Sequence, residues 1–132
     1  METQTQLEQA RRLWDAHRPR DGQEARRMVY DYVPAWLRAE MPKLYAQDGE
    51  SDPIVWLSLF LPEGRWTFYA TEFSEVAPDD TPNLMFGYMA SPLGADCDEL
   101  GYMTLEQISE LRGAQLRLPV ERDLWWQPKP LS

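Results

Sequence analysis

The chain has 132 residues, a formal net charge of −9 at pH 7 and 43% hydrophobic residues, including six tryptophans. This composition indicates a folded chain rather than a disordered one, and the length suits one domain with at most a small appendage. The first residues are polar, so we expect no secretory signal. The longest apolar run, at 54–61, is far shorter than the roughly 20 residues that span a bilayer. We therefore expect a cytoplasmic protein without membrane contact.

Charge is distributed unevenly along the chain. Residues 1–45 carry eight Lys or Arg against seven Asp or Glu, whereas residues 46–132 carry five against fifteen. An acidic body repels nucleic-acid phosphates, because binding them depends on Lys and Arg releasing counterions. Direct nucleic-acid binding is therefore not expected. The acidity favours solubility, and the alternative is a partner that is itself basic, such as a DNA-binding protein.

The first forty residues, 1–40, are predicted to form a helical segment of two helices. Thr5 and Glu8 have capping-box spacing before an apolar stripe at helical spacing. The stretch RPRDG then interrupts the pattern, and an aspartate with a glutamate three residues later opens a second stripe. Pro34 lies inside this second stripe, which predicts a kink or a restart near Val33. The pattern thus resembles a helical hairpin.

From residue 53 the pattern changes to that of strands. Apolar, β-branched and aromatic residues predict strands at 54–61, 66–74, 84–92 and 99–104. The first two are separated by PEGR, which is turn chemistry and predicts a β-hairpin. Gly87 marks a bulge or a close backbone contact in the third strand. These strands predict an antiparallel meander.

A short helix is predicted after the strands. It begins at Thr104, which has capping-box spacing to Gln107, and ends at Gly113, a residue type favoured just after a helix. The stretch RLPVERDLWWQP, residues 117–128, is predicted to be extended, and this extended segment ends at Pro128. Strands come first and the helix is segregated, so residues 41–132 are predicted to be an α+β domain, with about four antiparallel strands and the helical hairpin before it.

Several motifs resemble, in the same order, a bacterial family catalogued as domain-of-unknown-function family 2958. These are MPKLYAQDGESDPIVWLSLFLPEGRWTFYATEF, LMFGYM, DELGYMTLEQISELRG and LPVERDLWWQPKPLS, which together cover residues 41–132. The family typically reads LPxLY, an apolar strand, TWxxTE, FG, ELGYxSLxELxxxRG and LPxERDLxFxPxxPL. Its members are common on mobile genetic elements, so the resemblance implies an accessory protein of such an element. It implies no catalytic residues.

Histidine and cysteine chemistry is not indicated by the sequence. His17 is the only histidine and lies on the apolar stripe, away in sequence from the predicted domain. Cys97 is the only cysteine, so it cannot form an internal disulfide, which fits a reducing compartment. The aspartates on either side of Cys97 disfavour its thiolate. One Cys and one His do not form a zinc site, and we expect no cofactor or metal.

Carboxylates around one arginine are the main candidate for a site. Glu72, Glu99, Glu121 and Asp123 could surround Arg122 as an acid–base or magnesium site. The preferred interpretation is structural. In an extended segment Arg122 points with its apolar neighbours, and a buried guanidinium must be paired. We expect Glu72 or Glu99 to pair with it and to clamp the last segment onto the meander.

Exposed aromatic residues are the candidates for contact with a partner. Trp125 and Trp126 are adjacent, so in an extended segment they face opposite ways and one is expected to be exposed. Tyr30 and Tyr32 are weaker candidates. Three functions follow: a non-enzymatic module that binds a host or element-encoded protein, a small enzyme that uses the carboxylates, or a structural subunit that self-associates through the N-terminal helices.

Overall fold

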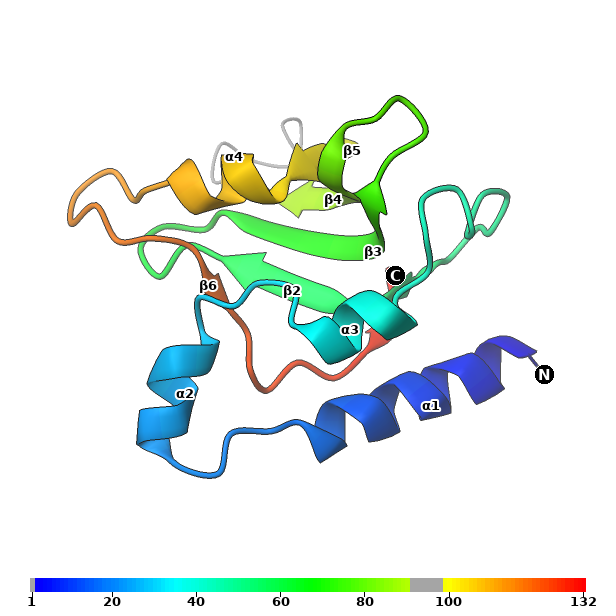
Figure 1. Ribbon diagram of the computed structural model, residues 1–132, viewed down its shortest axis with the longest axis horizontal. Helices are drawn as coiled ribbons and strands as arrows, with labels where there is room; N and C mark the ends of the chain where they lie inside the picture. Colours follow the sequence, from blue (N-terminus) through cyan, green and yellow to red (C-terminus); the bar gives the residue numbers. More distant parts are fainter. Residues whose placement is uncertain (1, 91–98) are drawn as a thin grey trace.

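The computed structural model describes residues 2–90 and 99–132 (Figure 1). The helices are α1 (Glu2–Ala16), α2 (Gly22–Met28), α3 (Ala35–Glu40) and α4 (Leu105–Glu110). The strands are β1 (Ile54–Val55), β2 (Leu57–Phe60), β3 (Thr67–Val76), β4 (Pro82–Ala90), β5 (Glu99–Thr104), β6 (Glu121–Arg122) and β7 (Lys129–Pro130).

The centre of the fold is a five-stranded antiparallel sheet with the order β5-β4-β3-β2-β6. A separate antiparallel pair joins β1 to β7, so the end of the chain lies beside the start of the first hairpin. The α+β class and the meander β2–β3–β4–β5 confirm the predicted architecture. The last segment, predicted only as extended, contributes an edge strand of the main sheet and a strand of the small pair.

Local signals explain most of the meander. The β2–β3 hairpin is closed by a turn in which Leu61 N–H donates to the Trp66 carbonyl, and Gly64 takes a positive φ of 91°. The β3–β4 pairing shifts register between Ala70 and Glu72, which is a β-bulge. Gly87 faces this bulge, where an added Cβ would overlap the Tyr69 carbonyl oxygen. Both predicted roles of Gly87 are thus present.

Helix α4 begins as predicted but ends early. The Thr104 hydroxyl accepts from Gln107 N–H, and the Gln107 side chain accepts from Thr104 N–H. The helix ends at Glu110, so the prediction that Gly113 follows it directly is wrong. Gly113 instead lies against the side chain of Glu63. That carboxylate accepts the backbone N–H groups of residues 115 and 116, which draws the chain out of the helix.

The N-terminal helices differ in part from expectation. Helix α1 already includes Glu2, so Thr5 lies inside it and the prediction that Thr5 caps the helix is wrong. The second cap is confirmed, since the Asp21 carboxylate accepts from Glu24 N–H at 2.8 Å. The predicted second helix is divided into α2 and α3, and Pro34 stands immediately before α3 with an extended backbone.

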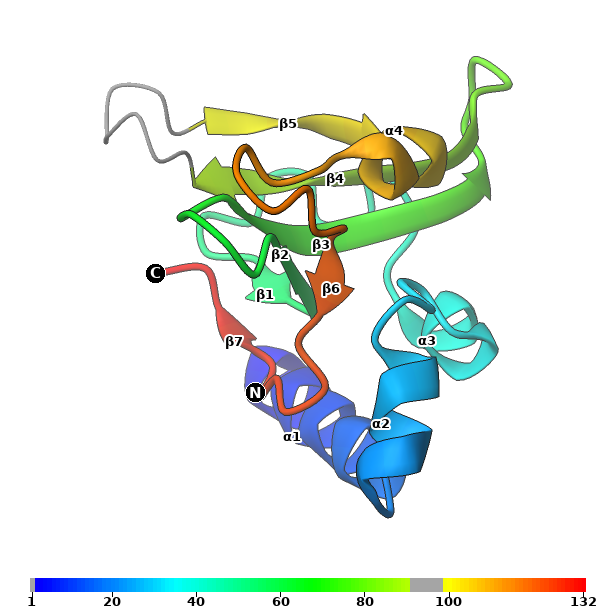
Figure 2. The same ribbon diagram turned by 90° about the vertical axis from the view of Figure 1, so that its left-hand side faces the viewer.

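The helices pack against the sheet through one hydrophobic core. Figures 1 and 2 show α1, α2 and α3 gathered at the β2–β6 side of the sheet, while α4 lies along β4 and β5. Trp14 of α1 is 1% exposed, and its indole N–H donates to the Trp56 carbonyl at 2.8 Å. Leu7 and Ala10 belong to the same buried cluster as Phe68 of β3. Residues 1–40 and 41–132 therefore share a core.

None of the helices in the described part of the chain combines the length and the apolar character needed to cross a membrane.

The substitution Gly87→Ala tests the close backbone contact at the bulge. The new Cβ would press on Tyr69 O and on Ala70 Cα, and both are backbone atoms that cannot move aside cheaply. We expect a loss of about 1–3 kcal/mol in the free energy of unfolding, measured by urea titration. Gly101→Ala on the neighbouring strand is the matched control, because its Cβ would meet nothing within 4 Å. Equal stability of the two variants would contradict this description of Gly87.

Candidate functional site

Arg122 is buried and is held by backbone carbonyls. It is 2% exposed, and its flanking residues Val120 and Leu124 are buried on the same side, as predicted from strand alternation. Its Nε donates to the Asp31 carbonyl at 2.8 Å and its backbone N–H donates to the Val29 carbonyl at 2.8 Å. Its guanidinium carbon lies 5.5 Å from the centre of the Trp14 ring. Arg122 thus ties β6 to the segment between α2 and α3.

Arg122 does not form an ion pair with either of the acidic residues predicted to be its partner. Within the described ranges, no carboxylate lies within ion-pair distance of its guanidinium. Glu99 begins β5, at the opposite edge of the sheet from β6, and it is exposed. Burial lowers the pKa of Arg122 to about 10, and the charges of Asp31 and Asp123 oppose that decrease. The expected clamp with Glu72 or Glu99 is therefore wrong in its partners, because Glu99 lies on the opposite edge strand and the Glu72 carboxylate is bound to backbone N–H groups elsewhere.

Glu72 is buried for a different reason. It is 4% exposed at the bulge of β3, and its two carboxylate oxygens accept the backbone N–H groups of Tyr45 and Gln47 at 2.9 and 2.8 Å. The Gln47 amide then accepts from Ile54 N–H at 3.0 Å and donates to the Thr71 carbonyl at 2.9 Å. These bonds fix the loop between α3 and β1 (residues 41–53) on the sheet.

The remaining predicted acids are also separate. Asp123 accepts the backbone N–H of Trp125 at 3.0 Å, and Glu121 stands opposite Phe60 in the β2–β6 pairing. Among the residues that the structure describes, no three His, Cys, Asp or Glu side chains come close enough together to hold a metal ion. The predicted carboxylates are thus distributed over three parts of the fold. Cys97 lies outside the described residues.

The candidate contact aromatics divide into exposed and buried ones. Trp125 is 64% exposed and Tyr30 is 51% exposed. Trp126 is 8% exposed and its indole N–H donates to the Val55 carbonyl at 3.0 Å. Tyr32 is half-buried, and its hydroxyl donates to the Val120 carbonyl at 2.6 Å. Burial raises the pKa of Tyr32. Trp126 and Tyr32 therefore hold the C-terminal segment, and Trp125 and Tyr30 remain available.

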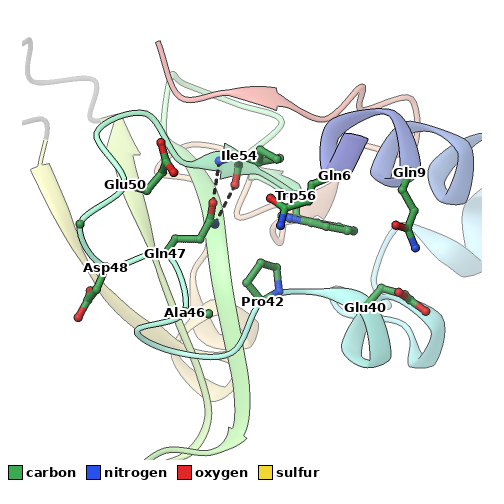
Figure 3. A pocket seen from close by; sticks show the side chains of 11 residues that line it. Gln6, Gln9, Glu40, Pro42, Ala46, Gln47, Asp48, Glu50, Ile54 and Trp56 are labelled. Atoms are coloured by element: carbon green, nitrogen blue, oxygen red, sulfur yellow. Dashed lines mark hydrogen bonds between the residues drawn. The ribbon is translucent and has the colours of Figure 1, made fainter. Parts of the chain in front are cut away.

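A hollow of about 520 Å³ lies between α1 and the loop 41–53 (Figure 3). Gln6 and Gln9 of α1 border one side, and Glu40 and Pro42 border the other. The complete lining is Gln6, Gln9, Glu40, Pro42, Ala46, Gln47, Asp48, Gly49, Glu50, Ile54 and Trp56. It includes three carboxylates and three amides, and it includes no lysine, arginine or histidine. We call this hollow the acidic pocket.

Trp56 supplies a hydrogen-bond donor at the acidic pocket. It is 7% exposed, and its indole nitrogen has no hydrogen-bond partner among the described residues. No fully enclosed side-chain nitrogen or oxygen in the described part of the chain lacks a partner. The Trp56 nitrogen is therefore not fully enclosed, and Trp56 is one of the residues that line the pocket. A ligand that reaches this nitrogen would find a donor beside several acceptors.

Sequence reasoning did not identify the acidic pocket. Glu40, Asp48 and Glu50 belong to segments that read as a helix end and a polar loop, and only the fold brings α1 beside them. The acidic stretch DGESD was a usable signal, because it gathers three carboxylates within five residues. In the structure it follows a segment that Glu72 fixes to the sheet. Nothing in the spacing along the chain indicated that Gln6 and Gln9 would face it.

Comparison with known proteins gives one result. Residues 31–132 match the family described as Protein of unknown function (DUF2958). The chain belongs to this family. The family match begins ahead of α3 and so includes the carbonyl of Asp31 that holds Arg122. No curated protein and no solved structure matches the chain.

The variant Glu72→Gln of this DUF2958 protein tests the anchor of the loop 41–53. An amide would turn one N–H group toward a backbone N–H, so a buried donor would lose its acceptor. We expect a loss of about 1–3 kcal/mol in the free energy of unfolding, with faster amide exchange at Tyr45 and Gln47. Glu75→Gln on the same strand is the control, because Glu75 is exposed. Unchanged exchange at both amides would show that Glu72 does not anchor the loop.

Proposed function

We propose that this DUF2958 protein is a non-enzymatic module that binds a basic segment of a partner protein in the acidic pocket. The observation that carries the proposal is the lining, which contains three carboxylates and no cation, together with an indole N–H of Trp56 that has no hydrogen-bond partner among the described residues. A volume of about 520 Å³ lies in the range of pockets that enclose small ligands or a few side chains.

The chemistry of the pocket suits a peptide with a Lys or Arg side chain. Glu40 and Glu50, at opposite ends of the pocket, each offer a carboxylate to a basic side chain (Figure 3), and charge-assisted hydrogen bonds of this kind are the strong ones. The Trp56 indole N–H can donate to a main-chain carbonyl of the same peptide. Gln6 and Gln9 can accept or donate beside it. A free metal ion would use only the carboxylates, whereas a basic peptide would use both kinds of group.

Charge and exposed aromatic residues support a protein partner. Residues 46–132 carry five Lys or Arg against fifteen Asp or Glu, which attracts a basic protein over distance and speeds association. Tyr45 is 50% exposed on the loop that forms the pocket, and Tyr102 is 49% exposed beside it. Exposed aromatic side chains are enriched where protein interfaces gain their binding energy.

We further propose a cytoplasmic accessory role on a mobile genetic element, with a basic host or element-encoded protein as the partner. The family resemblance supports the mobile-element setting, and the single cysteine fits a reducing compartment such as the cytoplasm. Self-association through the N-terminal helices is the less favoured alternative. The apolar stripe of α1 is already buried on the sheet, with Leu7 at 6% and Ala10 at 0% exposure.

An enzyme based on the predicted carboxylates is also less favoured. Glu72 already has both oxygens bound to backbone N–H groups, and Glu99 and Glu121 lie on opposite edge strands. Carboxylates that act together on one substrate must lie within reach of the same atoms.

Binding of a fluorescent Lys/Arg-rich peptide, measured by polarisation at physiological salt, tests the proposed function. We expect Glu40→Lys to weaken binding at least tenfold, because it places a cation in the pocket. Glu110→Lys is the matched control, since it changes the net charge equally at an exposed residue of α4. If both variants weaken binding equally, the attraction is general and the pocket is not the site.

The variant Trp56→Phe separates the indole donor from the aromatic wall. It keeps a ring in the core and removes only the N–H and the second ring. We expect weaker peptide binding by about three- to tenfold, in line with the loss of one hydrogen bond of about 1 kcal/mol. Circular dichroism checks that the fold is kept. Binding equal to that of the unmodified protein would exclude a role for the Trp56 donor.

A further inference from the structure

Arg122 carries a buried charge that its own fold satisfies only in part. Of its side-chain nitrogens, Nε donates to the Asp31 carbonyl, and the two terminal nitrogens have no hydrogen-bond partner among the described residues. A guanidinium has five N–H donors, so most of its donors are left over. In the described ranges, every fully enclosed side-chain nitrogen has a hydrogen-bond partner. The two terminal nitrogens have none, so they must be partly open to solvent.

The space next to Arg122 is a second cavity, of about 400 Å³, which we call the arginine cavity. It lies among the end of α1, helix α2 and the start of α3, and Arg122 is part of its lining. From these observations we propose that the arginine cavity binds an oxyanion, namely the carboxylate or phosphate group of a small organic molecule. The oxyanion would accept from the terminal nitrogens of Arg122, which suit bidentate contact with such groups.

Among the described residues that line the arginine cavity, the arginines other than Arg122 already have acidic or carbonyl partners. Arg20 and Glu24 both line it, but they bind each other at 2.9 Å. Arg18 donates to the Leu124 carbonyl at 2.8 Å and pairs with Asp15 at 3.0 Å. Asp31 also belongs to the lining. It is an exposed residue, and its carboxylate is beyond ion-pair distance of Arg122. An incoming oxyanion would thus supply the direct partner that the guanidinium lacks.

The walls of the arginine cavity suit the organic part of such a molecule. The rings of His17 and Trp36 stack at 4.3 Å with an angle of 6° between their planes, and both residues line the cavity. Met28 and Pro34 add apolar surface. Because the Leu13 carbonyl can only accept, His17 Nδ1 donates to it at 2.8 Å. A flat or apolar body would pack on this wall while its oxyanion reaches Arg122.

Titration with inorganic phosphate and with acetate, each against chloride at equal ionic strength, tests the proposal. We expect saturable shifts of the Trp14 and Trp36 indole N–H resonances, because Trp14 lies 5.5 Å from the guanidinium and Trp36 lines the cavity. A response to phosphate alone would assign a phosphoryl ligand, and a response to acetate alone would assign a carboxylate. No saturable shift with either anion would overturn the proposal.

A variant at the cavity mouth avoids the risk that changing Arg122 unfolds the protein. Ala16 is exposed and lines the arginine cavity. We expect Ala16→Glu, which brings a tethered carboxylate to the cavity, to weaken anion binding at least tenfold. Ala16→Gln is the matched control, since it has the same shape without the charge, and it should bind within twofold of the unmodified protein. Equal anion binding by both variants would contradict a site at this cavity.

Discussion

Arg122 is a buried cation near the end of the chain, and it contacts both the sheet and the N-terminal segment. It lies on the edge strand β6, opposite Leu59 of β2, and it holds the carbonyl of Asp31 while its backbone N–H holds that of Val29. The ring of Trp14 in α1 packs beside it. One residue near the end of the chain thereby joins the sheet edge to the N-terminal helices. Taking a cation out of water is costly, so its carbonyl and aromatic contacts must offset that cost.

A buried carboxylate plays the corresponding part elsewhere in the sheet. Glu72 binds two backbone N–H groups of the loop 41–53, as Arg122 binds backbone carbonyls. The two buried charges therefore contact the backbone and not each other. In the described part of the chain, two hollows of opposite charge preference lie along α1. The acidic pocket lies beside Gln6 and Gln9 and suits a cation, and the arginine cavity lies beside Ala16 and suits an anion.

Local patterns in the sequence predicted what depends on neighbours along the chain. The meander, the PEGR turn, the caps at Asp21 and Thr104 and the inward direction of Arg122 all follow from spacing, turn chemistry or strand alternation. Long-range placement did not follow. The predicted salt bridge joined Arg122 to Glu72 or Glu99, but Glu72 binds the loop 41–53 and sheet order puts Glu99 on the opposite edge from Arg122. Likewise, Gln6 and Glu40 line one pocket only because Leu7 and Trp14 dock α1 on the sheet.

Urea unfolding of Arg122→Ala tests the central role of the guanidinium most directly, with amide exchange followed in α1 and in residues 120–126. We expect a loss of about 2–5 kcal/mol in the free energy of unfolding, with faster exchange in both regions. Glu121→Ala, on the same strand, should change the free energy of unfolding by less than about 1 kcal/mol. An Arg122→Ala protein as stable as the Glu121→Ala protein, with α1 still protected, would show that the guanidinium does not hold these segments together.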